Sequence, residues 1–336
     1  AHIPVATTVM GKGSVADTHP LSVGVVGYFM GMNSATRYMR ELVTKADVIL
    51  LVGNRTNQNG TDSYRLYPPG ATYIHIDVDG AEIGRNYEAV RLAGDARETL
   101  LALTDALKRR DLSARKAARP LIEQEIRAAK AKYEAESSPV SKSESSPIRP
   151  ERIMAELEKV LGEDDIVVAD ASYSSIWVVN YLTARKPGQR FITPRGLAGL
   201  GWGFPMALGV KVARPQANVY CVVGDGGFGH VWSELETARR MGIKVTLIVL
   251  NNGILGYQKH AENVKFGAHT SAVEFGAVDH AGIARSVGCE GIRVEKAADI
   301  ATALAVARAS ETTTLIDVII DENAYPPITL FSPQQS

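Results

Sequence analysis

Short apolar runs alternate with helix-like stretches along the first third of the chain. Residues 47–53 (DVILLVG) and 73–79 (YIHIDVD) each have the composition of a buried strand. The residues between them, 54–70, form a loop rich in Asn, Gly, Asp and Pro. Continuous apolar strands that alternate with helices are typical of parallel sheets covered on both faces. The pattern therefore predicts an α/β fold.

The middle of the chain has a different pattern. Residues 107–134 consist mostly of Ala, Lys, Arg and Glu, which predicts an exposed helix. Residues 136–147 are rich in Ser, Glu and Pro and are too polar to build a core, which predicts a linker. We therefore expect a first domain at 1–108, a helix and linker at 109–150, and a second domain at 151–336.

The alternation of strands and helices resumes after the linker. Four apolar runs predict strands, at residues 166–170, 218–223, 244–250 and 314–320. Helical stretches separate them, as in a doubly wound parallel sheet. The predicted fold class is thus α/β, with two doubly wound parallel-sheet domains.

Composition and charge exclude several classes of protein. The 37 basic and 37 acidic residues give a formal net charge of zero, which argues against a nucleic-acid-binding protein. No apolar run approaches the roughly 20 residues of a membrane-spanning helix, and the first residues do not resemble a signal peptide. The two cysteines, Cys221 and Cys289, argue against a disulfide scaffold. We expect a cytoplasmic protein that binds small molecules rather than nucleic acid or membranes.

Two polar segments follow consecutive strands of the second predicted domain, residues 224–227 (GDGG) and 251–253 (NNG). Ligands of such sheets bind beyond the carboxyl ends of the strands, and adjacent parallel strands would bring these segments side by side. Glycines let the backbone approach a phosphate, and a following helix N-terminus favours its negative charge. The Asp225 carboxylate and the Asn252 amide oxygen suit Mg²⁺. The sequence therefore predicts a site for a phosphate group and a magnesium ion.

These segments resemble the motif of thiamine diphosphate enzymes, and the wider match is to the branch of acetolactate synthase and glyoxylate carboligase. Residues 195–262 carry this resemblance best. The first domain resembles the central domain of the family through VATTVMGKG (5–13), HPLSVG (19–24), ADVILLVGNR (46–55), IHIDVDGAEIGRN (74–86) and GDA (94–96). The resemblance implies the C-terminal portion of a Rossmann-like central domain, followed by a thiamine diphosphate-binding domain.

The resemblance also implies roles for individual residues. Asp225 and Asn252 would bind Mg²⁺ through their side chains, and Ile254 through its carbonyl group. Leu200 would wedge the cofactor into a bent conformation, and the Ala198 carbonyl would accept a hydrogen bond from its amino group, so these two are the candidate catalytic residues. The other candidates for cofactor binding are Ser174, Ser175, Gly224, Gly226, Gly227, Gly253 and Leu255.

The implied activity is that of a lyase or transferase acting on 2-oxo acids, with the cofactor reacting as a C2 ylid and forming an enamine. In this family a glutamate on a pyrimidine-binding domain activates the cofactor, and no segment of this sequence resembles that domain. We expect it in a longer chain or a separate subunit, and we expect this chain alone to be inactive. The resemblance also implies a homo-oligomer, a dimer or a tetramer.

Other interpretations stay open at the level of sequence. Biosynthetic acetolactate synthases carry a Trp where this chain has Ala261, and the smaller side chain leaves room for a larger acceptor substrate or for another partner side chain. A 2-hydroxyacyl-CoA lyase and a cyclic diketone hydrolase are alternative activities. A non-enzymatic subunit that binds the cofactor is a further alternative. Residues 199–203 (GLGWG) suggest a dinucleotide oxidoreductase, but no strand directly precedes them.

The central domain of the family often binds FAD or an ADP-like group. Arg55, Asp77, Asp95 and Ala96 match positions near such a nucleotide. The same residue types also cap turns and helices, so both a nucleotide site and a structural role are open here.

Overall fold

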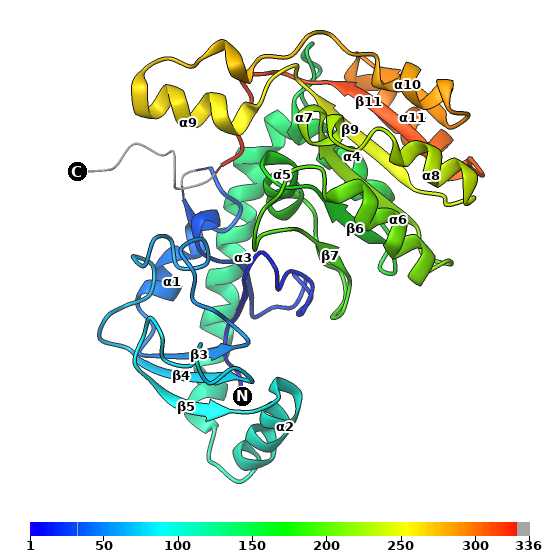
Figure 1. Ribbon diagram of the computed structural model, residues 1–336. Helices are drawn as coiled ribbons and strands as arrows, with labels where there is room; N and C mark the ends of the chain where they lie inside the picture. Colours follow the sequence, from blue (N-terminus) through cyan, green and yellow to red (C-terminus); the bar gives the residue numbers. More distant parts are fainter. Residues whose placement is uncertain (32, 328–336) are drawn as a thin grey trace. The chain divides into compact units, whose positions relative to one another are not determined.

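The computed structural model describes residues 1–31 and 33–327, which divide into two compact units (Figure 1). Unit 1 contains residues 1–8 and 19–134, and unit 2 contains residues 9–18 and 135–327. In this described part of the chain, no helix combines the length and the apolar character needed to cross a membrane. Both units are built on parallel strands, as the sequence predicts.

Unit 1 contains a three-stranded parallel sheet in the order β3-β4-β5 and a separate parallel pair, β1-β2. The strands are β1 (Val5–Thr7), β2 (Ser22–Val25), β3 (Val48–Val52), β4 (Thr72–Asp77) and β5 (Ala89–Ala93). The helices are α1 (Arg40–Thr44), α2 (Ala96–Leu107) and α3 (Ser113–Ser141), whose last turns belong to unit 2.

The long helix α3 differs from its prediction in two ways. It was expected to be exposed, but Ile126 and Ala129 are buried in the same apolar cluster as Leu51 and Tyr73. It also continues to Ser141, so the first half of the stretch predicted as a linker is helical. Polar composition prevents these residues from building a core, yet it does not prevent a helix from continuing on the surface.

Unit 2 contains a six-stranded, fully parallel sheet in the order β10-β11-β9-β8-β6-β7. Its strands are β6 (Ile166–Ala169), β7 (Phe191–Ile192), β8 (Val219–Gly224), β9 (Thr246–Asn251), β10 (Glu290–Val294) and β11 (Thr314–Ile319). Its helices are α4 (Pro150–Val160), α5 (Tyr173–Tyr181), α6 (Gly203–Ala213), α7 (Asp225–Gly229), α8 (Glu234–Arg240), α9 (Gly256–Phe266), α10 (His280–Ser286) and α11 (Ile300–Ala309).

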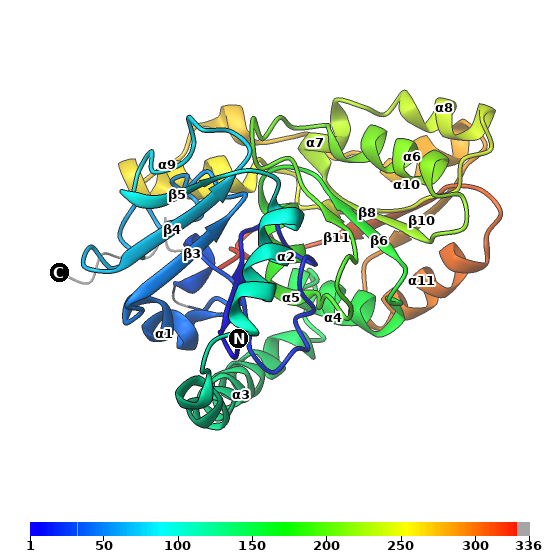
Figure 2. The same ribbon diagram turned by 90° about the horizontal axis from the view of Figure 1, so that it is seen from below.

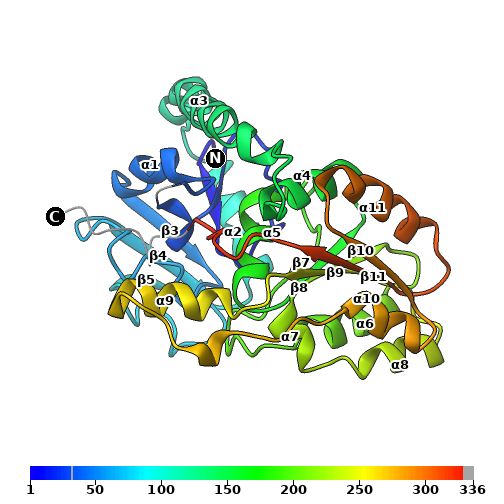
Figure 3. The same cartoon turned by 90° about the horizontal axis from the view of Figure 1, so that it is seen from above.

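Helices cover both faces of this sheet, with α4 and α11 on one face and α6, α8 and α10 on the other (Figures 2 and 3). On the second face Phe204, Leu235 and Ala281, one from each helix, join the central strands in one buried cluster. All four apolar runs predicted in this half are strands, namely β6, β8, β9 and β11. They are buried almost throughout, which explains why they read as continuous apolar segments.

The strand order determines where a ligand can bind. After β6 the chain first adds β7 on one side and then crosses to place β8 on the other side of β6. The carboxyl ends of β6 and β8 therefore flank the point at which the winding direction changes. Open α/β sheets bind their ligands in the crevice at this point.

Candidate functional site

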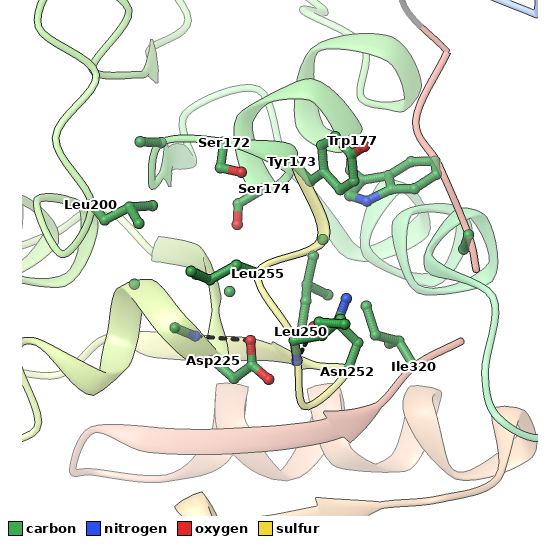
Figure 4. A pocket seen from close by; sticks show the side chains of 17 residues that line it. Ser172, Tyr173, Ser174, Trp177, Leu200, Asp225, Leu250, Asn252, Leu255 and Ile320 are labelled. Carbon is green, nitrogen blue, oxygen red and sulfur yellow. Dashed lines mark hydrogen bonds between the residues drawn. The ribbon is translucent and has the colours of Figure 1, made fainter. Parts of the chain in front are cut away.

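A cavity that is open to solvent lies at this change of winding direction, where β6, β8 and β9 end (Figure 4). The predicted site residues that line it are Ser174, Leu200, Gly224, Asp225, Gly226, Gly227, Asn252, Ile254 and Leu255. The sequence therefore identified most of the loops that surround the cavity.

Three predicted residues lie outside the cavity lining. The Ser175 side chain is buried, and its hydroxyl donates a hydrogen bond to the Ser172 carbonyl at 3.0 Å. Ala198 lies in the exposed loop before Leu200 and has a positive φ of 55°. Gly253 is part of the loop after β9, with a φ of 68°. A left-handed backbone at Ala198 is costly for a residue with a side chain, and such strain is typical of functional loops.

Asp225 joins the two predicted loops directly. Its Oδ2 accepts a hydrogen bond from the Gly253 N–H at 2.7 Å, and its Oδ1 accepts one from the Gly226 N–H at 2.8 Å. Burial raises the pKa of Asp225 to about 6, and these backbone donors act in the opposite direction. The loops after β8 and β9 are thus side by side, as adjacent parallel strands require.

The loop after β9 is held in place from its far side. The Gly253 carbonyl accepts a hydrogen bond from the Phe275 N–H, and the Leu255 N–H donates one to the Val273 carbonyl, both at 2.8 Å. The Asn252 side-chain oxygen accepts a bond from the Ile254 N–H at 3.3 Å. Across the described residues, no three acidic, cysteine or histidine side chains gather as a metal cluster. A metal here would need amide, carbonyl and ligand oxygens beside the single Asp225 carboxylate.

Asp170 organises the loop that carries Leu200. This fully buried residue follows β6; its Oδ2 accepts a hydrogen bond from the Gly201 N–H and its Oδ1 one from the Gly203 N–H, both at 3.0 Å. The Asp170 carboxylate thereby satisfies two backbone donors at the start of α6. Leu200 itself is 41% exposed and extends from this loop toward the cavity (Figure 4). The sequence marked Asp170 only as a residue at a strand end.

Several lining residues were not predicted. Tyr173 and Trp177 come from α5, while Ile320 and Ala324 follow β11. The Tyr173 hydroxyl lies 2.7 Å from Nδ1 of His260 on α9. The sequence could have indicated Ile320 and Ala324 as lining residues, because they lie just beyond the predicted strand β11, at the ligand-binding edge of the sheet.

The candidate nucleotide residues lie in unit 1 and make local contacts. Asp95 caps α2 by accepting a hydrogen bond from the Glu98 N–H at 3.0 Å, and Ala96 is the first residue of that helix. Asp77 accepts a bond from the N–H two residues ahead, also at 3.0 Å. The exposed Arg55 lies 4.0 Å from Glu82. These contacts are those of a helix cap, a turn and a surface ion pair.

Comparison with known proteins agrees with the geometry of unit 2. Residues 170–318 match the model described as "Thiamine pyrophosphate enzyme, C-terminal TPP binding domain". Residues 1–103 match the model described as "Thiamine pyrophosphate enzyme, central domain". The chain belongs to the thiamine pyrophosphate enzymes. The family's cofactor is thiamine diphosphate, and the matched C-terminal domain contains the loops after β6, β8 and β9 that line the cavity.

Relatives of this thiamine pyrophosphate enzyme are named as acetolactate synthases. The chain is 34% identical over 329 residues to a "Probable acetolactate synthase large subunit" of Methanocaldococcus jannaschii, covering 95% of this chain and 53% of that protein. It is 32% identical over 335 residues to a protein of the same name from Methanococcus aeolicus, covering 96% and 54%. An acetolactate synthase large subunit from Parasynechococcus marenigrum is 30% identical over 331 residues, covering 97% and 51%. The chain spans about half the length of the curated relatives that it matches.

Proposed function

We propose that this chain forms the cofactor- and metal-binding part of a thiamine diphosphate- and Mg²⁺-dependent enzyme acting on 2-oxo acids, similar to acetolactate synthase. The observation that carries the proposal is the 2.7 Å hydrogen bond between Asp225 and Gly253. It holds the two motif loops at one cavity, beside the change of winding direction of the sheet. The names of the relatives support the reaction class.

The residues of the cavity fit the diphosphate and the metal. Positions 226 and 227 require glycine, because a Cβ at either position would come within 3.0 Å of a neighbouring side chain. Without a side chain, the backbone at these positions can lie close to a phosphate. Asp225, Asn252 and the Ile254 carbonyl offer the three protein oxygens that would hold Mg²⁺, and the diphosphate would supply others. Ser174 lies at the same wall and can donate a hydrogen bond to a phosphate oxygen.

The rest of the cavity would orient the cofactor and exclude water. When bound, thiamine diphosphate would supply the carbon nucleophile that the carbonyl chemistry of a 2-oxo acid requires. Leu200 would hold the cofactor in its bent conformation, with the Ala198 carbonyl accepting a hydrogen bond from its amino group. One side of the cavity is apolar and would exclude water from the reacting atoms; it is formed by Leu250, Leu255 and Ile320.

The proposal extends to the assembled protein. A pyrimidine-binding domain, in the same polypeptide or in a partner subunit, would supply the activating carboxylate, and the active protein would be a dimer or a tetramer. This chain alone would bind the cofactor without turnover. We leave FAD and ADP-like groups out of the proposal, because Asp77 and Asp95 already serve a turn and a helix cap.

The test measures the binding of thiamine diphosphate to the chain by calorimetry, once in the presence of Mg²⁺ and once in the presence of a chelator. We expect binding that depends on Mg²⁺ and that weakens at least about 10-fold in Asp225→Asn, because the variant loses the only carboxylate ligand. The control is Asp164→Asn, which changes an exposed carboxylate of the same unit. Binding by the unaltered chain that ignores Mg²⁺, or equal losses in both variants, would refute the proposal.

A further inference from the structure

A second pocket lies at the edge of the unit 2 sheet where β8 and β9 begin. Its lining includes Tyr220 near the start of β8 and Thr246, the first residue of β9. The cavity that would hold the cofactor lies at the other edge, where the same strands end. Because β8 contains six residues and a strand rises about 3.3 Å per residue, roughly 20 Å separates the two places. The second pocket is therefore distinct from the cofactor cavity.

Three cations line this pocket. Lys211 comes from the last turn of α6, Arg308 from the last turn of α11, and Lys244 from the residues just before β9. In the part of the chain that the structure describes, their hydrogen-bond partners are all main-chain carbonyl groups, at 2.7–3.3 Å, and no carboxylate forms an ion pair with any of them. The pocket thus gathers positive charge that no ion pair neutralises.

The positions of the neighbouring charges favour an external anion. Burial, and then the charge of Lys244, lower the pKa of Lys211, because like charges at close range repel each other. The Asp165 carboxylate lies behind the pocket and is not part of its lining. Its Oδ1 accepts a hydrogen bond from Asn218 Nδ2 at 2.9 Å, and its Oδ2 accepts one from the Gly162 N–H at 2.8 Å. Asp165 is therefore engaged elsewhere and leaves the cations without a direct counter-ion.

Two hydroxyl groups of the pocket also lack partners. Tyr220 and Thr246 are only 1% and 6% exposed, and they lie opposite each other on neighbouring strands. Within residues 1–31 and 33–327, neither hydroxyl group makes a hydrogen bond. Neither oxygen is sealed in the interior, so both are open to a ligand in the pocket. Polar groups of buried residues normally have a partner, and a ligand that accepts hydrogen bonds would provide one for both.

We propose that this pocket binds a phosphate group, either as the free ion or at the end of a phosphate ester. Lys211, Lys244 and Arg308 would compensate its charge, and Tyr220 and Thr246 would donate hydrogen bonds to its oxygens. A phosphate group suits this set of donors better than a carboxylate does, since it carries close to two negative charges and at least three acceptor oxygens. The site goes beyond the function proposed above, because it lies apart from the loops that would hold the cofactor.

The test is a titration of the full chain with inorganic phosphate at constant ionic strength, in the absence of thiamine diphosphate and Mg²⁺. Two-dimensional NMR of the amide groups gives the dissociation constant and locates the bound ion. We expect saturable shifts at residues 218–220 and 244–246. Shifts confined to 225–227 and 252–254 would place phosphate at the cofactor loops and overturn the inference, as would the absence of saturable binding.

Substitutions of the two hydroxyl residues test the site without removing any hydrogen bond that the protein makes by itself. Tyr220→Phe and Thr246→Val should each weaken phosphate binding about 3- to 10-fold, as the loss of one hydrogen bond allows. Arg308→Met should weaken it at least about 10-fold, because a charged contact is lost. The control Lys296→Met removes an exposed cation shortly before α11 and should leave the affinity unchanged.

The variants also define the results that contradict the inference. Equal losses in Arg308→Met and Lys296→Met would show that phosphate responds only to the overall charge of the protein. Full affinity in both Tyr220→Phe and Thr246→Val would show that these hydroxyl groups do not contact the ion. A parallel titration with methyl phosphate separates the two sources: tighter binding than that of inorganic phosphate identifies an ester as the ligand, and equal or weaker binding identifies the free ion.

Discussion

At Gly227 the backbone is so close to its neighbours that no side chain fits. A Cβ there would lie 2.2 Å from Oδ2 of Asp170, the carboxylate that holds the loop of Leu200. We predict that Gly227→Ala lowers the free energy of unfolding by about 1–3 kcal/mol, as overpacking of a tight site does. The measurement is urea denaturation of the chain.

Gly229 offers a matched control within the same short helix. A Cβ at Gly229 would meet a neighbouring side chain only at 3.9 Å, an ordinary contact. Gly229→Ala should therefore leave stability unchanged or raise it by up to about 1 kcal/mol through the lower entropy of the unfolded chain. Equal effects of the two substitutions would show that the contact with Asp170 does not constrain this loop.

Whether a site residue could be predicted depends on where its partners lie in the sequence. The place of Asp225 and Asn252 at the cavity was predictable, because each directly follows a strand of the parallel sheet. The role of Asp170 was not, because its hydrogen-bond partners Gly201 and Gly203 lie 31 and 33 residues further along the chain.

At the scale of elements, apolar runs predicted the central strands and the edge strand β3, but missed three other edge strands. The central strands β8 and β9 are buried along nearly their whole length. Both edge strands of the six-stranded sheet escaped prediction: β10 is partly exposed and β7 has only two residues. In unit 1, β5 was missed for the same reason, since it lies at the edge of its sheet and is mostly exposed. A strand that is open to solvent needs no continuous apolar run, so its sequence resembles that of a loop.

The segment after β11 is attached to α9 through Lys259, whose bonds to Glu322 and Asn323 hold Ala324 against the cavity. We predict that Lys259→Met accelerates amide hydrogen exchange in residues 321–327. Global stability should change by about 1 kcal/mol or less, because Glu322 is half-exposed and stays hydrated. Exchange followed by mass spectrometry measures the local effect.

The control for this substitution is Lys265→Met, at the exposed end of the same helix. Lys265 lies over the Phe266 ring, and no hydrogen bond or ion pair joins its side chain to residues 321–327. Its substitution should leave exchange in 321–327 unchanged. If amide exchange in 321–327 is the same in both variants, other contacts hold this segment. One such contact is the stacking of the Tyr325 and His260 rings, whose centroids lie 4.0 Å apart.

At the scale of the whole molecule, the two units do not follow the order of the chain. Residues 9–18 belong to unit 2, although residues on both sides of them belong to unit 1. The Asp17 N–H donates to the Ala184 carbonyl and the Gly188 N–H to the Gly13 carbonyl, both at 2.7 Å. Sequence patterning could not show this, because the segment forms no strand or helix of its own and its partners lie more than 160 residues away.

This division predicts a characteristic response to the cofactor. A ligand stabilises only the states that bind it, by about 2.7 kcal/mol at a concentration of 100 times the dissociation constant. Thiamine diphosphate with Mg²⁺ should therefore slow amide exchange in residues 135–327 and in 9–18, and much less in 19–134. Residues 1–8 and 9–18 provide the sharpest comparison, since they are neighbours in sequence but belong to different units. If 9–18 followed 1–8 instead, its contacts with residues 184–189 would not persist in solution.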